Sequence, residues 1–176
     1  MARWCFAAAA IGFALAALAL LGAALVLRGG MSARAGPSAL EARIARTLRG
    51  WAIPREVRAA RNPVAAGPEA VAAGLAHFAD HCATCHANDG SGRTPVGEKL
   101  YPRAPDMRRR ETQELTDGEL FYVIENGVRF TGMPAWGGEG GAEGGRQLVR
   151  FIRTLPELTA GEQARSRAAI SARTSA

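Results

Sequence analysis

The feature that most constrains this 176-residue chain is one short segment, HFADHCATCHANDG at residues 77–90, which holds two of the three cysteines and all three histidines. Residues 82–86 read Cys-Ala-Thr-Cys-His, the C-x-x-C-H spacing at which two thiols attach a c-type haem. A thioredoxin-like dithiol would need a βαβ setting, and a structural zinc site would need a second ligand pair further on. The sequence offers neither. We therefore predict one haem c, covalently attached to Cys82 and Cys85, with His86 as an axial ligand of the iron.

The second axial position of the iron takes another ligand or stays open. Met107, in APDMRRR, and Met133, in FTGMPAWG, are the two methionines outside the N-terminal region. Met133 stands between a glycine, which removes side-chain bulk next to a flat ring, and a proline, which stiffens the loop. We therefore predict Met133 as the second ligand. His77 and His81 are expected to be surface histidines.

These two motifs together, residues 82–86 and a methionine 47 positions after His86 in a G-M-P-A-W context, resemble a class I cytochrome c of the small bacterial type. The resemblance covers residues 68–157. It implies an all-α fold, the class I cytochrome c fold, with about three to five helices around one covalently attached haem. It also implies that the first and last helices of the domain cross through a small residue and aromatic side chains. The residues that would do so here are Gly74, Phe78, Leu148, Phe151 and Ile152.

The same resemblance implies the surroundings of the haem. In the family, a proline carbonyl accepts the proton on the far nitrogen of the ligating histidine, and such a bond fixes the orientation of the ring. Pro95 is the match, with Pro102 and Pro105 nearby in the sequence. The residues that match polar and aromatic neighbours of the haem propionates are Tyr101, Arg103 and Trp136. The two aromatic residues are equally compatible with simple packing, and the arginine with a solvated position.

Sequence patterns place three helices in the predicted domain. The first runs from about residue 69 to residue 83, after a Gly-Pro start, and delivers the cysteines at its end. The second, TDGELFYVIENG, opens with Thr116 and Glu119 in capping-box spacing and stops at Asn-Gly. The third, GRQLVRFIRTLP, carries leucine and isoleucine on one face and ends at Pro156. Glycine- and proline-rich loops lie between them, and no strand is predicted.

An uncharged segment lies at the N-terminus. Trp4–Leu27 contains no charged residue and is flanked by Arg3 and Arg28. It is long enough to cross the ~30 Å hydrocarbon core of a bilayer as a helix. We therefore predict a transmembrane anchor over residues 1–28. The alternative is a cleavable signal peptide, although its apolar region would normally be only ~7–15 residues long.

Charge is distributed unevenly along the chain. Residues 28–61 hold eight arginines against two glutamates, a net charge of +6, whereas residues 68–157 hold ten basic against thirteen acidic residues, a net charge of −3. The basic character thus belongs to a predicted Arg/Pro-rich linker, residues 29–67. No basic patch with interleaved aromatic residues is present, so we expect no nucleic-acid partner. Residues 158–176 are predicted to be a flexible C-terminal tail.

The linker contains one helical pattern, SALEARIARTLRG, whose Leu40, Ile44 and Leu48 recur every four residues and form one apolar stripe. A helix on the membrane surface and a solvated linker helix are equally compatible with this pattern. The rest of the linker is expected to be a flexible connector between the anchor and the haem domain.

Ligation by histidine and methionine leaves no open iron position for a substrate, and methionine raises the reduction potential. We therefore expect an electron carrier rather than an enzyme, with redox proteins as donor and acceptor and no small-molecule substrate. The alternatives are a haem c subunit fixed in a larger oxidase or dehydrogenase complex, and a haem enzyme or gas sensor with an open iron site.

The expected location is the cytoplasmic membrane, with the haem domain facing the periplasm or the cell exterior, because covalent haem attachment takes place on that side in bacteria. The eight arginines after the anchor point the other way, since positive charge favours the cytoplasmic side. The expected orientation therefore depends on the haem chemistry and conflicts with the charge rule.

Overall fold

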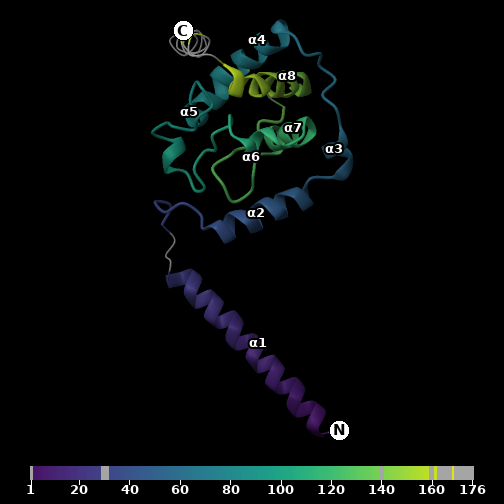
Figure 1. The fold of residues 1–176 in the computed structure, drawn as a ribbon, viewed down its shortest axis with the longest axis vertical. Helices are drawn as coiled ribbons and strands as arrows, with labels where there is room; N and C mark the ends of the chain where they lie inside the picture. Colours follow the sequence, from purple (N-terminus) through teal and green to yellow (C-terminus); the bar gives the residue numbers. More distant parts are fainter. Residues whose placement is uncertain (1, 29–31, 139–140, 159–160, 162–167, 169–176) are drawn as a thin grey trace. The chain divides into compact units, whose positions relative to one another are not determined.

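The structure is a computed structural model that describes residues 2–28, 32–138, 141–158, 161 and 168, and it divides into two compact units, residues 1–33 and 34–176. The first unit is one helix, α1 (Ala2–Arg28), drawn in purple in Figure 1. Its segment Phe6–Arg28 is long and apolar enough to cross a membrane, judged by length and composition. This observation agrees with the predicted anchor, although a signal sequence would show the same helix.

In the described residues of the second unit, all regular secondary structure is helical and no β-strand is present, which confirms the predicted all-α class. Its elements, in chain order, are α2 (Ala39–Ala52), α3 (Arg55–Ala59), α4 (Pro68–His77), a π-helical turn (Phe78–Cys82), α5 (Ala83–His86), a 3-10 turn (Gly97–Lys99), α6 (Arg110–Gln113), α7 (Asp117–Asn126), α8 (Gly141–Thr154) and a 3-10 turn (Leu155–Glu157).

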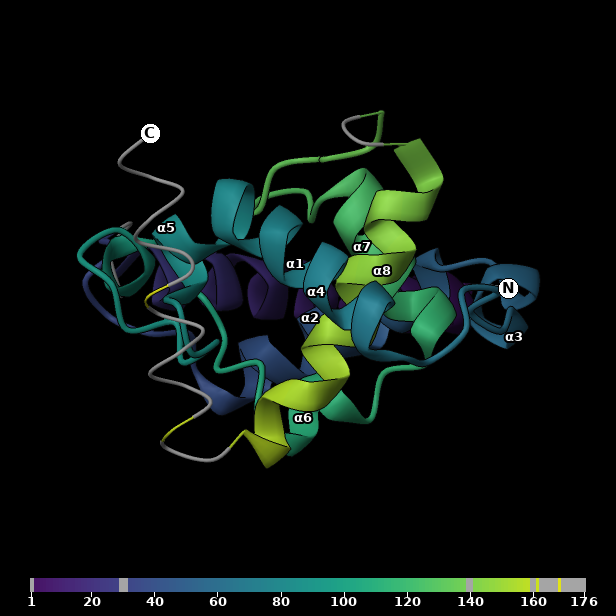
Figure 2. The same ribbon diagram turned by 90° about the horizontal axis from the view of Figure 1, so that it is seen from above.

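Helices α4 and α8 cross in close contact and form the centre of the core, and they lie side by side in Figures 1 and 2. A Cβ atom at Gly74 would overlap the carbonyl oxygen of Gln147 and lie 2.9 Å from Cβ of Phe151. The rings of Phe78 and Phe151 meet at a centroid distance of 5.1 Å. Both phenylalanines are buried, together with Leu148 and Ile152. The implied crossing of the first and last domain helices is therefore confirmed.

The segment predicted as one helix from about residue 69 to residue 83 is helical, but it is not a uniform α-helix. The Ala83 N–H donates to the carbonyl oxygen of Phe78, five residues earlier, which defines a π-helical turn. Such a turn accommodates one extra residue and therefore rotates the next helical segment relative to α4. It buries Phe78, Ala79 and Cys82 together. The first cysteine of the motif thus enters the core directly from this turn.

Helix α7 begins with the predicted capping box. The Thr116 hydroxyl accepts the Glu119 N–H at 3.1 Å, and the Glu119 carboxylate accepts the Thr116 N–H at 2.8 Å. Its apolar side, with Leu120 and Ile124, packs into the same core as α4 and α8. Helix α8 ends at Thr154, two residues before the predicted end. The capping box therefore fixes where α7 begins, and the core fixes which side it buries.

The predicted linker differs from the structure, because residues 34–67 belong to the same compact unit as the domain. Helix α2 forms where the pattern predicts a helix, capped by Ser38. Helix α3 lies directly on α7, where a Cβ at Gly118 would overlap the carbonyl oxygen of Val57. The Thr116 hydroxyl also donates to the Arg58 carbonyl oxygen at 2.8 Å. The second half of the linker is therefore folded onto the domain, and it is not a free connector.

One arginine of α8 holds the chain between α3 and α4. The Arg150 guanidinium donates to the Val64 carbonyl oxygen at 2.6 and 2.9 Å and to the Asn62 carbonyl oxygen at 3.2 Å. The Asn62 amide in turn donates to the Arg146 carbonyl oxygen at 2.8 Å. The division at residue 67 remains a prediction about where the cytochrome part begins. Of the predicted tail, only residues 158, 161 and 168 lie within the described residues.

Candidate haem-binding site

The two cysteines of the motif lie at a junction of secondary structure. Cys82 closes the π-helical turn and is buried, and Cys85 lies half-buried on α5. Both are free thiols. Burial, and to a lesser extent the neighbouring Cys85, raises the pKa of Cys82 to about 12. A reactive dithiol needs a thiolate of low pKa, so this environment does not fit a redox pair.

His86 ends α5 with its side chain 6% exposed. Burial lowers the pKa of this imidazole, and the carbonyl of Pro105 acts in the opposite direction. Its Nδ1 atom is buried without a well-aligned hydrogen-bond partner. Buried polar atoms nearly always have a partner, and a metal ligand must be a neutral imidazole. His86 therefore has the protonation and the surroundings that an iron ligand requires.

Pro105 is the proline whose carbonyl acts on His86. The resemblance matched Pro95 to this role, but Pro95 lies on an exposed turn. Both residues belong to the loop after the motif, and spacing alone does not distinguish them. The assignment to Pro95 stays a prediction, and the structure favours Pro105 for this role.

The loop after the motif folds back onto it. The Gly92 N–H donates to the His86 carbonyl oxygen at 2.8 Å, and the Thr94 hydroxyl donates to the Cys85 carbonyl oxygen at 3.3 Å. The Met107 N–H donates to the Gly90 carbonyl oxygen at 2.8 Å. These hydrogen bonds use backbone atoms of α5 and atoms of the loop. They do not involve the thiols of Cys82 and Cys85 or the imidazole of His86.

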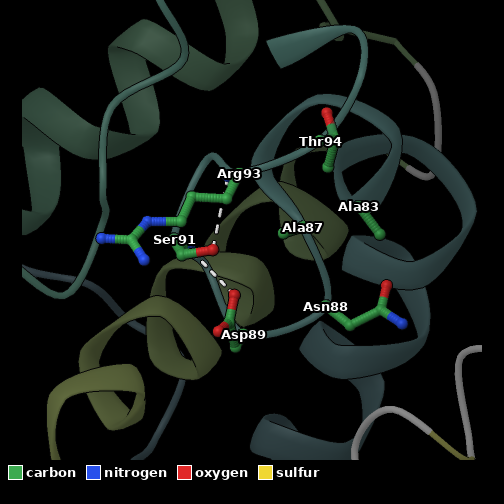
Figure 3. A pocket seen from close by; sticks show the side chains of 7 residues that line it. All are labelled: Ala83, Ala87, Asn88, Asp89, Ser91, Arg93 and Thr94. Carbon is green, nitrogen blue, oxygen red and sulfur yellow. Dashed lines mark hydrogen bonds between the residues drawn. The ribbon is translucent and has the colours of Figure 1, made fainter. Parts of the chain in front are cut away.

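A small open pocket lies beside this loop, shown in Figure 3. Ser91 connects its walls, because its N–H donates to the Asp89 carboxylate at 3.0 Å and its hydroxyl accepts the Arg93 N–H at 3.3 Å. The residues that line the pocket are Ala83, Ala87, Asn88, Asp89, Ser91, Arg93 and Thr94. Neither cysteine nor His86 is among them, so this pocket is not the haem site.

Met133 lies in a loop that follows α7, is closed by a hydrogen bond within itself and is joined back to α7 at its far end. The Val128 N–H donates to the Met133 carbonyl oxygen at 3.1 Å, and the Trp136 N–H donates to the Ile124 carbonyl oxygen at 3.0 Å. The Met133 side chain is half-buried. Met107, by contrast, is 9% exposed and belongs to the apolar core cluster. Met107 thus has a packing role already, whereas Met133 is held by its backbone with its side chain uncommitted to the core.

The three tentative haem neighbours lie in different settings. The Tyr101 hydroxyl donates a hydrogen bond to the Glu41 carboxylate of α2, and this bond raises the pKa of Tyr101. Arg103 is exposed. Trp136 packs against the core, and its ring lies 4.9 Å from that of His81.

His77 and His81, expected on the surface, are half-buried, and their rings lie 4.9 Å apart. His81 therefore joins the π-helical turn to the end of the methionine loop through Trp136. Sequence reasoning did not anticipate this contact. The one signal for it is that His81 directly precedes Cys82.

Within the described part of the chain, no group of three or more His, Cys, Asp or Glu side chains could hold a metal ion. A free thiol at the end of the π-helical turn, a second free thiol on α5 and the buried, incompletely partnered imidazole of His86 fit a haem attached through its edge and ligated by the imidazole. The helical fold and this donor set define the site as that of a class I c-type cytochrome.

Comparison with known protein families agrees with this class of protein. Residues 69–152 match the family model described as "Cytochrome C oxidase, cbb3-type, subunit III". The match begins at the start of α4 and ends within α8, so it contains the motif, the π-helical turn and the methionine loop but not α1–α3. This part of the chain is therefore a c-type cytochrome domain, and the match supports a haem c electron-transfer protein.

Proposed function

We propose that this protein is a membrane-tethered carrier of single electrons. Its one haem c is attached covalently to Cys82 and Cys85, and His86 and Met133 are the axial ligands of the iron. The observation that carries the proposal is the buried His86 at the end of α5, directly after a free thiol on the same helix and four residues after the free thiol that closes the π-helical turn. When bound, the haem supplies a one-electron iron couple.

Each residue has a separate task in this proposal. The cysteines keep the cofactor on the chain. Burial keeps the His86 imidazole neutral, so that a ring nitrogen is available to the metal. Met133, as a thioether ligand, raises the reduction potential and fills the last position on the iron. With both axial positions occupied, a substrate has no place on the metal, and electron transfer is favoured over catalysis.

Residues around the ligands complete the proposed site. The Pro105 carbonyl, or that of Pro95 if the loop rearranges around the haem, orients the His86 ring. Tyr101, Arg103 and Trp136 surround the haem edge. In this arrangement the chain positions the iron and adjusts its potential, and it performs no organic chemistry.

The proposed location follows from α1 and from the covalent attachment. Helix α1 anchors the protein in the cytoplasmic membrane, and the domain faces the periplasm or the cell exterior, where covalent haem attachment occurs in bacteria. Retention of the full-length protein in membranes washed at high salt supports the anchor. Release by high salt alone would contradict it.

A second candidate function is a fixed subunit of a larger oxidase. The observation that favours it is the family match, because the matched model is described as an oxidase subunit. Mild solubilisation followed by size separation distinguishes the two functions. A fixed subunit stays with other redox proteins at constant stoichiometry, whereas a free carrier separates from them.

The ligand assignment has a direct test in two matched variants, Met133→Leu and Met107→Leu. Leucine nearly conserves the volume of methionine, so neither variant should collapse the core. Met133→Leu should abolish the weak red-edge absorption of the sulfur–ferric iron bond, lower the potential, and let the reduced protein bind carbon monoxide rapidly. Met107→Leu should leave all three unchanged. The opposite pattern would move the ligand role to Met107, and rapid carbon monoxide binding by the unaltered protein would favour the open-site alternative.

A further inference from the structure

Helix α2 has two opposite faces, and only one of them contacts the domain. Ala42 and Arg49 are half-buried and Ile53, which caps the helix, is buried; these three residues lie on one helix face. The other face carries an apolar row that recurs at the same helical spacing. Its members and their exposed fractions are Leu40 (68%), Ile44 (51%), Leu48 (54%) and Trp51 (79%).

The apolar row therefore points away from the core. Because it lies on the far side of the helix from Arg49 and Ile53, it takes no part in the contact between α2 and the domain. Four large apolar side chains in one continuous row on an exposed helix are more than scattered surface residues, and such patches mark contact surfaces. Figure 1 shows α2 on the opposite side of this unit from α4 and α8.

Helix α2 is fixed to the domain at both of its ends. The Tyr101 hydroxyl donates to the Glu41 carboxylate at the N-terminal end, and the Arg58 guanidinium donates to the Gly50 carbonyl oxygen at the C-terminal end. Arg58 also pairs with Glu119 of α7 at 3.1 Å. Whatever binds the apolar row therefore binds the whole domain in one orientation.

Charge and chain position indicate what the row binds. Between residues 34 and 61, five arginines are exposed: 34, 43, 46, 55 and 61. Only ten residues, 29–38, separate the membrane-length helix α1 from α2. A helix with an apolar face, arginines on its other sides and a nearby anchor has the composition of an interfacial helix that lies on anionic lipid.

We infer that α2 lies in the surface of an anionic bilayer, with Leu40, Ile44, Leu48 and Trp51 inserted below the headgroups and the arginines near the lipid phosphates. This inference extends the proposed tether. The haem domain is then held on the membrane in one orientation through α2, and it does not swing on a flexible connector. A redox partner must approach it from the faces that α2 leaves open.

The test uses the full-length, haem-loaded protein in vesicles of phosphatidylglycerol and phosphatidylcholine that contain a lipid with a photoreactive acyl chain. After illumination, cleavage at glutamate separates the fragment 1–41, which contains α1, from the fragment 42–56, which contains most of the apolar row. The fragment 99–111, from the domain loop, serves as the unlabelled reference. We expect lipid on the first two fragments and none on the third.

Two sets of substitutions sharpen the test. Changing Leu40, Ile44, Leu48 and Trp51 to serine should lower labelling of 42–56 at least about tenfold, because the apolar area that drives interfacial binding is lost. Labelling of 1–41 should remain. The matched control, Ala39→Ser with Ala45→Ser, changes exposed positions of the same helix outside the row and should label like the unaltered protein.

The outcomes separate this inference from the proposed tether. If 1–41 is labelled while 42–56 is labelled no more than 99–111, the tether stands and the inference is wrong. If 42–56 is labelled and 1–41 carries no label within α1, the inference stands and the anchor is wrong. Crosslinking of 42–56 to a second copy of the chain or to another protein, in place of lipid, would also overturn the inference. Equal labelling of 42–56 in purely zwitterionic vesicles would remove the role of the arginines.

Discussion

The crossing of α4 and α8 makes Gly74→Ala the most informative single change in the fold. An added Cβ would lie 2.7 Å from the Gln147 carbonyl carbon and 2.9 Å from Cβ of Phe151. Non-bonded carbon atoms prefer about 3.5–4.0 Å, so the two helices must separate by roughly 1 Å. The nearest atoms are mainly backbone, which cannot rotate out of the way.

Two opposing effects set the size of the change. Alanine in place of a helical glycine would add about 1 kcal/mol of stability through helix propensity. Overpacking of a tight core costs typically 1–3 kcal/mol and sometimes more, and here it separates Phe78 from Phe151, both fully buried. Because separation affects the whole crossing, we take the upper end of that cost, about 3 kcal/mol, and subtract the gain of about 1 kcal/mol, which leaves a net loss of about 2 kcal/mol. At about 4 °C per kcal/mol for a folded unit of this size, the melting temperature falls by roughly 8 °C.

Thermal unfolding of the haem-loaded protein in detergent, followed by circular dichroism of the haem and of the helices, measures this loss. Gly144→Ala is the matched control on α8, since its added Cβ would come no closer than 3.6 Å to the His77 ring. It should melt at or slightly above the temperature of the unaltered protein. If Gly74→Ala melts no lower than Gly144→Ala, the close crossing does not exist in solution.

Two further predictions concern polar contacts. Arg150→Gln removes the hydrogen bonds that hold the segment before α4. Trypsin should therefore cut after the exposed Arg61 roughly tenfold faster, which corresponds to about 1.4 kcal/mol. Arg146→Gln is the control and should not change the rate of this cut. The Arg108 guanidinium, through its hydrogen bonds, holds the pKa of Asp106 below its usual value, so this pair stabilises the fold above the unfolded-state pKa and loses its effect as pH falls through the folded-state pKa. Asp106→Asn should therefore cost about 0.5–1 kcal/mol at neutral pH in urea unfolding and nearly nothing in acid, and a cost that is independent of pH would contradict this role.

Local patterns predicted the helices of the domain well, for identifiable reasons. The capping box at Thr116 and Glu119 requires only residues three apart, and the structure contains it. The apolar face of α8 follows directly from its helical spacing. The motif at residues 82–86 predicts haem attachment from five consecutive residues alone. In each case, neighbouring residues carry the whole signal.

The features that sequence reasoning missed depend on contacts between distant parts of the chain. Arg150 and Val64 are 86 residues apart, and nothing near Val64 indicates that its carbonyl has a partner. The arginines of the predicted linker suggested a solvated connector, yet Arg58 is used to fix α2 and α7. The amino-acid composition of a segment predicts flexibility correctly only when the segment makes no contact with residues distant in the sequence.

The π-helical turn is another feature that the sequence did not predict. The predicted helix carries Phe78 and Cys82 on one face at normal spacing, which a plain α-helix would satisfy. In the structure, Phe78–Cys82 form a π-helical turn, in which the backbone hydrogen bond spans five residues and not four, and both side chains are buried. Whether a helix takes such a turn depends on what its last residues must contact, and here those residues are the start of the haem-binding motif.

The covalent attachment of one haem is the central claim, and the mass of the intact, denatured polypeptide after extraction with acidic solvent tests it most directly. We predict a single species whose mass is that of the chain, or of its processed form, plus one haem. Cys82→Ala combined with Cys85→Ala should give only the bare chain. A pigmented preparation whose polypeptide carries no added mass after extraction, or one that carries two haems, would contradict the account.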